Sequence, residues 1–164
     1  MTSPATGTPA TQIVQVRMGE LFVGRSEAQF KTLLGSCVGL VLYDRKALVG
    51  GLAHIMLPSS SGHNGPAGKF VDTAVAELIR RMETLGVRSH RLLAKLAGGA
   101  TMFPTAAALT IGDQNVEATH RELKKRSIPI VGLHCGGTQG RRMTFSVALT
   151  RATIEIVGAD AVEI

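Results

Sequence analysis

The sequence predicts a layered α/β sandwich with a mixed β-sheet, and three observations support this fold class. Apolar runs of strand length outnumber helical stretches, and the expected order is β-hairpin, helix, strand, helix, β-hairpin, which is typical of helices packed on a sheet. The 164 residues are 45% hydrophobic, enough for one domain of ordinary size to bury a core. Nineteen glycines against 4% aromatic residues indicate tight turns in a framework of Val, Ile, Leu and Ala.

The N-terminal segment is expected to lie outside the folded part. Residues 1–11 are mainly Thr, Pro, Ala, Ser and Gly without apolar periodicity, which predicts a disordered tail. Residues 12–164 are then expected to form a single domain. Within it, residues 13–23 predict one or two short strands with a break near Gly19, followed by a loop or irregular strand.

A β-hairpin is predicted next. Residues 38–44 and 48–57 are apolar runs of strand length, separated by a short polar turn. With a two-residue turn, Cys37 lies directly opposite His54, with Cβ atoms about 4.5–5.5 Å apart, close enough for a thiol–imidazole hydrogen bond. The Arg-Lys pair of this turn is not one that two-residue turns prefer, and a shift of one residue would put the side chains on opposite faces.

Two helices and further strands complete the predicted fold. Residues 70–86 carry an apolar stripe at helical spacing and stop at Gly86, and residues 112–127 place acids early and bases late. The Ser-, Gly- and Pro-rich residues 58–68 predict a surface loop. The remaining expected strands are 91–103, 128–135, and a closing pair over 143–150 and 151–158.

Charge and cysteine content limit the function classes. The formal net charge of +6 favours acidic partners, but with so few aromatics a nucleic-acid role lacks support. Two cysteines, Cys37 and Cys135, are too few for a disulfide framework and lie in no zinc-type spacing, which indicates a reduced compartment. No apolar run is long enough to span a membrane and no signal-peptide pattern is present, so we expect a cytoplasmic protein without membrane insertion.

Cys37 is the candidate nucleophile. Gly35 and Ser36 precede it, and their backbone amides could serve as oxyanion donors. A cysteine in an apolar strand is also commonly a small buried hydrophobic residue, and a histidine there is commonly a satisfied core residue. The hairpin favours the reactive interpretation, because nucleophilic catalysis requires a base within hydrogen-bond reach of the thiol, and His54 is that candidate base.

Other groups of chemically active residues compete with this pair. His134 and Cys135 are adjacent in a predicted strand, so they point to opposite faces, and Cys135 is expected to be structural. A zinc site built from His54, His63, His134 and Cys135 would need ligands from separated segments without supporting spacing.

Two glycine pairs and a basic cluster have simple structural explanations. The pairs at 98–99 and 136–137, assisted by Arg141 and Arg142, could cradle an anion, but they match no phosphate-loop motif. They are more simply turns that permit close packing. The basic cluster at 120–126 is most simply a solvated helix face.

Six blocks of the sequence occur together in an order and spacing that resemble one known family. They are LLGSCVGLVLYD, GGLAHIMLP, GKFVDTAVAELI, KLAGGATMF, IGDQNVEATHRELKKRSIPIVG and CGGTQGRRMTFSVALT. Over about residues 20–150 the chain resembles the CheD family of chemoreceptor glutamine deamidases. The resemblance implies a three-layer α/β/α sandwich with a mixed β-sheet, similar to the catalytic domains of deamidating toxins.

The resemblance also implies an activity and its residues. CheD-like proteins are protein-glutamine deamidases that convert specific glutamines of methyl-accepting chemotaxis receptors to glutamate through a cysteine thioester. Carried onto this chain, Cys37 is the nucleophile and His54 the general acid/base. The family's third catalytic position, a threonine shortly before the cysteine, falls at Thr32 or, one residue earlier, at Lys31. No metal or cofactor is implied, and Cys135 stands where the family commonly has an acidic residue.

Two partners follow from the same resemblance. The substrate would be the cytoplasmic helical region of the receptors, which is rich in Glu, and a basic surface including Lys124, Lys125 and Arg126 would contribute to docking. The family also engages a CheC-like phosphatase of the response-regulator pathway. An alternative function is therefore a binding module that engages and regulates such a phosphatase with little deamidase activity.

Overall fold

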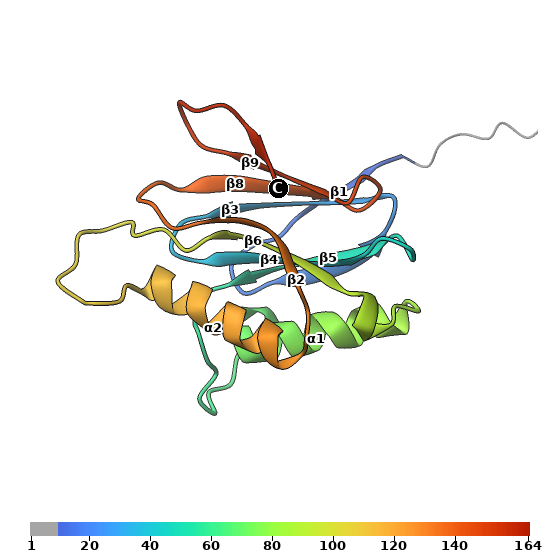
Figure 1. Ribbon diagram of the computed structural model, residues 1–164, viewed down its shortest axis with the longest axis horizontal. Coiled ribbons are helices and arrows are strands. Elements are labelled where there is room, and N and C mark those ends of the chain that lie inside the picture. Colours follow the sequence, from blue (N-terminus) through green and yellow to red (C-terminus); the bar gives the residue numbers. More distant parts are fainter. Residues whose placement is uncertain (1–9) are drawn as a thin grey trace, which may run out of the picture.

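The structure, a computed structural model, describes residues 10–164, so the predicted tail lies outside it except for Ala10 and Thr11. The described residues form three layers: two helices, a middle β-sheet and an outer β-sheet (Figure 1). The elements are β1 (Gln12–Gln15), β2 (Leu21–Arg25), β3 (Ala28–Leu34), β4 (Val38–Asp44), β5 (Val49–Ile55), α1 (Val71–Thr84), β6 (Leu93–Gly98), α2 (Ile111–Lys125), β7 (Ile130–Cys135), β8 (Arg141–Ser146), β9 (Arg151–Glu155) and β10 (Val162–Glu163), with short 3-10 helices at Ala67–Lys69 and Ser89–Arg91.

Both sheets have five strands and are mixed. The outer sheet has the order β1-β3-β8-β9-β10, and the middle sheet has the order β2-β5-β4-β6-β7. Neighbouring strands are antiparallel except for the parallel pairs β1 with β3 and β6 with β7. The predicted α/β class with mixed sheets is therefore confirmed.

The content of the layers differs from the expected α/β/α arrangement. Both α-helices cover the same face of the middle sheet, and a second sheet covers its other face (Figure 1). The burial patterns explain this α/β/β order. Strands β4 and β5 are buried along their whole length, as expected for a sheet covered on both faces, whereas β3 and β8 bury alternate residues and need a partner on one face only.

Two apolar cores separate the three layers. The core between the helices and the middle sheet is built from α1, α2 and one face of β4, β5 and β6. The inter-sheet core is built from the other face of the middle sheet and the inward face of the outer sheet. Its fully buried side chains include Phe30, Leu34, Tyr43, Leu52 and Phe145.

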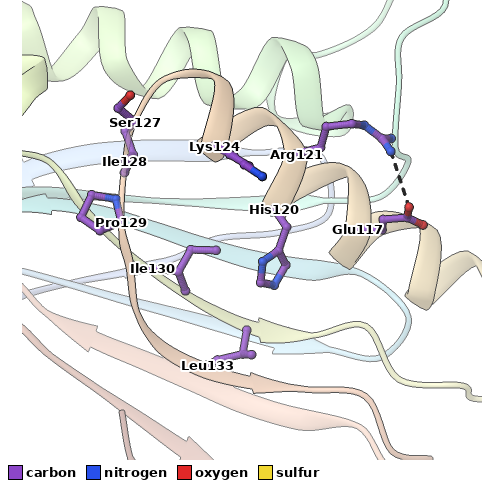
Figure 2. Close-up of a pocket in the computed structure, with 9 residues that line it drawn as sticks. All are labelled: Glu117, His120, Arg121, Lys124, Ser127, Ile128, Pro129, Ile130 and Leu133. Carbon is purple, nitrogen blue, oxygen red and sulfur yellow. Dashed lines mark ion pairs between the residues drawn. The ribbon is translucent and has the colours of Figure 1, made fainter.

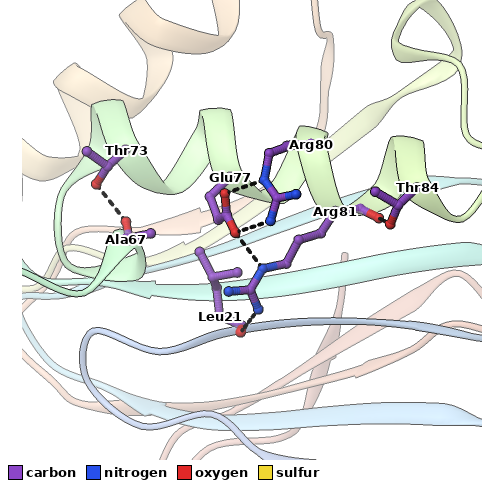
Figure 3. Close-up of polar contacts among 7 residues, drawn as sticks. All are labelled: Leu21, Ala67, Thr73, Glu77, Arg80, Arg81 and Thr84. Atoms are coloured by element: carbon purple, nitrogen blue, oxygen red, sulfur yellow. Dashed lines mark hydrogen bonds and ion pairs between the residues drawn. The ribbon is translucent and has the colours of Figure 1, made fainter.

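Helix α1 matches its prediction and is tied to the neighbouring strand. It ends before Gly86, whose φ of 89° lies in the left-handed region that glycine favours. On its outer side Arg81 donates to Glu77 and, at 3.3 Å, to the carbonyl of Leu21 in β2 (Figure 3). Hydrogen bonds from Arg80 and Arg81 lower the pKa of Glu77 to about 2.

The predicted hairpin is present, but its register was wrong. Residues 45–48 form a four-residue connection between β4 and β5, and Gly39 rather than Cys37 pairs with His54. The cause is Asp44, whose carboxylate accepts hydrogen bonds from the turn's own Lys46 and Ala47 amides at 2.8 and 3.1 Å. Because the register moved by two residues, every side chain stays on its predicted face.

The segment after β2 was also mispredicted. Residues 28–34 form the regular strand β3 instead of a loop or irregular strand. Their burial alternates strictly, as expected of a strand with one face on the core. The sequence alternates only over residues 28–31, because polar Thr32 is buried and apolar Leu33 is exposed, and this hides the period of two. In the described part of the chain, neither helix is long and apolar enough to cross a membrane.

Candidate active site

The three predicted site residues come from three neighbouring segments and share the inter-sheet layer. Thr32 lies on the inward face of β3, and His54 lies on β5. Cys37 immediately precedes β4 and packs against the inter-sheet core. Since Gly39 pairs with His54, Cys37 lies two residues before the partner of His54, just outside the strand pairing.

Thr32 is the residue in direct contact with His54. Its Oγ1 lies 2.7 Å from His54 Nδ1 and 2.7 Å from the carbonyl oxygen of Val16. The carbonyl can only accept, so the single hydroxyl proton goes to Val16, and Nδ1 must carry the proton that it donates to Thr32. This network assigns the neutral imidazole its Nδ1–H tautomer and leaves Nε2 as the free base. Lys31, the alternative position, is on the opposite face of β3.

The backbone around Cys37 is held by the first glycine pair. Gly99 donates to the Cys37 carbonyl at 2.8 Å, and a Cβ at Gly98 would overlap that same carbonyl oxygen. Gly98 also has a φ of 103°, so this position requires glycine for two reasons. The close packing predicted for residues 98–99 is confirmed, although Gly98 is the last residue of β6 and the pair forms no regular turn.

Two backbone amides at this loop are unused. In the described part of the chain, neither the Ser36 nor the Cys37 N–H donates a hydrogen bond to protein. Unbonded amides next to a candidate nucleophile are suited to stabilise an oxyanion.

Burial favours the neutral form of both Cys37 and His54, so it moves their two pKa values in opposite directions. Desolvation raises the pKa of the Cys37 thiol above its ordinary value. Desolvation also lowers the pKa of His54, against a smaller opposing effect from the Val16 carbonyl. The described contacts include no hydrogen bond between the Cys37 thiol and the His54 ring. Both shifts favour a neutral thiol and a neutral imidazole over a thiolate–imidazolium pair.

Cys135 has a different environment from Cys37. It pairs with Gly98 across β6 and β7, but its side chain packs on the helix-facing core. Burial raises its pKa to about 11, although the nearby Arg141 charge opposes this. Arg141 is itself buried and donates to the carbonyls of His134 and Gly136. These hydrogen bonds hold the backbone next to the glycine pair 136–137, so the guanidinium is engaged with the protein and not with a substrate anion.

Asn115, which was not among the predicted site residues, joins the two segments of the site. This residue is fully buried on α2, and its Nδ2 donates to the carbonyls of Ser36 at 3.2 Å and Met56 at 3.0 Å. The first carbonyl belongs to the residue before Cys37, and the second lies two residues after His54. An amide side chain on the buried stripe of a predicted helix is the signal that could have identified it.

Of the hollows among the described residues, one adjoins the Cys37 loop and a broader one does not. A pocket of about 370 Å³ is lined by Ser36, the loop 100–110 and the start of α2, so it opens beside the Cys37 loop. A broader hollow of about 760 Å³ lies farther away, between α2 and the start of β7. Figure 2 shows His120 pointing toward Ile130 there, while Arg121 pairs with Glu117 on the outside.

The alternative zinc ligands are not assembled. Among residues 10–164, no three or more His, Cys, Asp or Glu side chains come together as a metal site requires. The basic cluster at 120–126 is exposed except for Glu122 and Leu123, as expected for a solvated helix face.

Comparisons with known proteins agree on one family. Residues 56–156 match the family model CheD, described as CheD chemotactic sensory transduction. Three relatives, each named probable chemoreceptor glutamine deamidase CheD, are similar over most of both chains. The Methanococcus vannielii protein is 43% identical over 87% of this chain and 94% of its own. The Pyrococcus abyssi protein is 39% identical over 93% and 98%, and the Clostridium botulinum (strain Hall) protein 38% identical over 92% and 97%.

Proposed function

Since the chain belongs to the CheD family, we propose that it is a protein-glutamine deamidase acting on chemoreceptors. The observation that carries this proposal is the Thr32–His54 contact at 2.7 Å, which leaves a free imidazole nitrogen in the layer that also holds Cys37. The matched family region begins at residue 56, so support for these three residues comes from the geometry. Thr32 is a positioning residue, whereas Cys37 and His54 carry the chemistry.

The first half-reaction forms a thioester. His54 Nε2 takes the Cys37 thiol proton as the sulfur attacks the carboxamide carbon of the glutamine side chain. The carbonyl oxygen becomes an oxyanion, which the unbonded Ser36 and Cys37 amides stabilise. As the carbon–nitrogen bond breaks, the imidazolium returns its proton to the leaving nitrogen, and ammonia departs.

The second half-reaction releases glutamate. A water molecule gives a proton to His54 Nε2 and attacks the thioester carbon. The carbon–sulfur bond breaks, the proton returns to the Cys37 sulfur, and the carboxylic acid so formed loses its own proton to solvent to give the glutamate carboxylate. Each residue ends in its starting state.

The proposed substrate is the cytoplasmic helical region of a methyl-accepting receptor, which places the reaction in the cytoplasm. The exposed basic side chains of α2, including Lys124 and Lys125, suit a Glu-rich partner. A CheC-like phosphatase is a further proposed partner and would bind without being modified.

The proposal is tested by incubating the protein with a receptor cytoplasmic fragment and mapping the fragment by mass spectrometry. We expect a gain of about one dalton at particular glutamines, with one ammonia released for each, because an NH₂ group is replaced by OH. The His54→Ala variant should leave the fragment unchanged. A folded wild-type protein that binds a CheC-like phosphatase but leaves every glutamine intact would favour the binding-module function instead.

A further inference from the structure

Asn115 is a buried residue of α2 whose side chain bonds to backbone outside the helix. These bonds are required neither to form the helix nor to pack it. Asparagine has low helix propensity, and a fully buried amide is unfavourable unless its donors and acceptors are bonded. Here Nδ2 donates to two carbonyls that flank strands of the middle sheet, while Oδ1 has no partner among the described residues. Both bonds go to the segments that hold Cys37 and His54.

The bond to Ser36 fixes the orientation of the next amide. The described chain contains no cis peptide, so the Ser36 carbonyl and the Cys37 N–H point in opposite directions across one planar unit. Asn115 holds that carbonyl toward α2. The Cys37 N–H therefore points away from α2, and the Cys37 thiol also lies on that side, against the inter-sheet core.

A second anchor fixes the following peptide unit. Gly99 donates to the Cys37 carbonyl at 2.8 Å, so both peptide planes flanking Cys37 are held by their carbonyls. The N–H of Cys37 stays unbonded between these two anchors. A preoriented, unbonded amide is what an oxyanion donor requires, because it costs no reorganisation when charge develops.

The bond to Met56 ties the same side chain to the other half of the site. Met56 follows β5, two residues after His54, and its carbonyl accepts from Nδ2 at 3.0 Å. One nitrogen with two protons thus joins the nucleophile loop to the strand of the base. Neither a carboxylate nor an aliphatic side chain can supply these two donors.

We propose that Asn115 is a positioning residue: its bond to the Ser36 carbonyl orients the Cys37 N–H as oxyanion donor, and its bond to the Met56 carbonyl holds the Asn115 amide itself in place. This inference rests on the proposed deamidase function. It adds that the Cys37 N–H is the oxyanion donor and that Asn115 of α2 sets the orientation of this N–H.

The test compares reactions that do and do not form an oxyanion at Cys37. Acylation by 4-nitrophenyl acetate passes through a tetrahedral oxyanion, whereas alkylation by iodoacetamide needs only a reactive thiol. In Asn115→Leu, of nearly equal size, we expect acylation and the kcat of deamidation to fall about 10²-fold, the typical loss on removing an oxyanion donor. Alkylation of Cys37 and the KM for the receptor fragment should stay within about threefold.

Thr119→Val is the matched control. Thr119 is fully buried on the same helix, but its hydroxyl bonds only the Asn115 carbonyl one turn earlier. This variant should leave both reactions of Cys37 within about threefold of the parent, while losing stability like any buried hydrogen-bond deletion. Asn115→Asp, which keeps the shape and loses the paired donors, serves as a second variant and should behave like Asn115→Leu.

Several results would overturn the inference. They are unchanged acylation in a folded Asn115 variant, an equal fall of acylation and alkylation, or failure of both variants to fold, which would make the role structural. The acylation assay uses no receptor. If the wild-type protein is acylated at Cys37 but deamidates no glutamine, the proposed function is wrong. The effect of the Asn115 variants on acylation would still test the role of Asn115.

Discussion

Cys37 and Cys135 lie at the same end of the middle sheet, but on opposite faces of it. Burial raises the pKa of both thiols, so desolvation does not distinguish them. What differs is the layer each one faces. Cys37 faces the inter-sheet layer, where Thr32 leaves His54 with a free nitrogen. Cys135 faces the helices, and the charged group near it, Arg141 of β8, is engaged with backbone carbonyls.

On the proposed mechanism, the two cysteines are distinguished by the proton acceptor in the layer that each one faces. A buried thiol without a base becomes less reactive, because burial favours the neutral form. The Cys37 layer contains a base whose tautomer is set by a second residue. Substitutions on the two faces of the middle sheet should therefore differ in their effects on activity.

The largest expected effect is the loss of activity on replacing the nucleophile. Cys37→Ala should reduce deamidation of a receptor fragment by at least about 10³-fold, because no other group forms the thioester. Cys135→Ala should retain most of the activity. Circular dichroism melting of both variants controls for packing loss at either buried position. Loss of activity in the folded Cys135 variant alone would reverse the assignment.

Replacing the residue that orients the base should have the next largest effect. Thr32→Val keeps the side-chain shape but leaves the buried His54 Nδ1–H and the Val16 carbonyl without their partner. We expect kcat to fall by about 10- to 100-fold, on the scale of a general-base contribution, with little change in KM. Thr32→Ser retains the hydroxyl and should recover most of the rate. Equal rates for the Val and Ser variants would show that the hydroxyl has no such role.

The two glycine pairs allow a matched test of backbone constraint. Gly98→Ala would place a Cβ against the Cys37 carbonyl at a φ of 103°, whereas Gly136→Ala at a φ of 84° meets open space next to Cys135. Both substitutions incur left-handed strain of about 1–3 kcal/mol, and only the first adds a backbone clash. Urea unfolding should therefore show the greater loss for Gly98→Ala, and activity should fall only there. Equal losses of stability would contradict the close approach.

The pH dependence of the reaction should reflect the environment of His54. Catalysis requires neutral His54, and burial lowers its pKa, so the neutral form persists to lower pH than for an exposed histidine. The acidic limb of kcat/KM, measured by ammonia release, should fall below the ordinary imidazole value of about 6.5. An acidic limb above that value would contradict the lowered pKa of His54, whereas a loss of activity on the basic side as an imidazolium deprotonates would indicate a resting thiolate–imidazolium pair.

The smallest effect is expected on the outer side of the helix layer. Glu77 has a folded-state pKa of about 2, below its unfolded value, so its stabilisation is present at neutral pH and is lost as pH falls toward 2. The pairs with Arg80 and Arg81 are partly solvent-exposed, so Glu77→Gln should cost only about 0.5 kcal/mol at pH 7. Urea unfolding should show a smaller difference at pH 3, and deamidation should not change. A large loss of activity would mean that the helix layer controls the site.

The sequence predicted the face of each hairpin side chain better than the contacts between them. The Arg45–Leu48 turn shifted the register by two residues, yet Cys37 stayed on the His54 face because side-chain alternation has a period of two. The contact between Thr32 and His54 crosses two sheets, and local patterns do not encode how sheets stack. The second sheet was likewise missed because β3 was taken for an irregular segment.

The most direct test of the account is to identify the residue that carries the acyl intermediate. A receptor peptide containing a target glutamine is mixed with the protein, quenched in acid during turnover, and the protein is mapped by mass spectrometry. We predict an adduct of the peptide less one ammonia on the fragment containing Cys37, and its absence in Cys37→Ala. The same adduct on Cys135, or steady turnover by Cys37→Ala, would contradict the account.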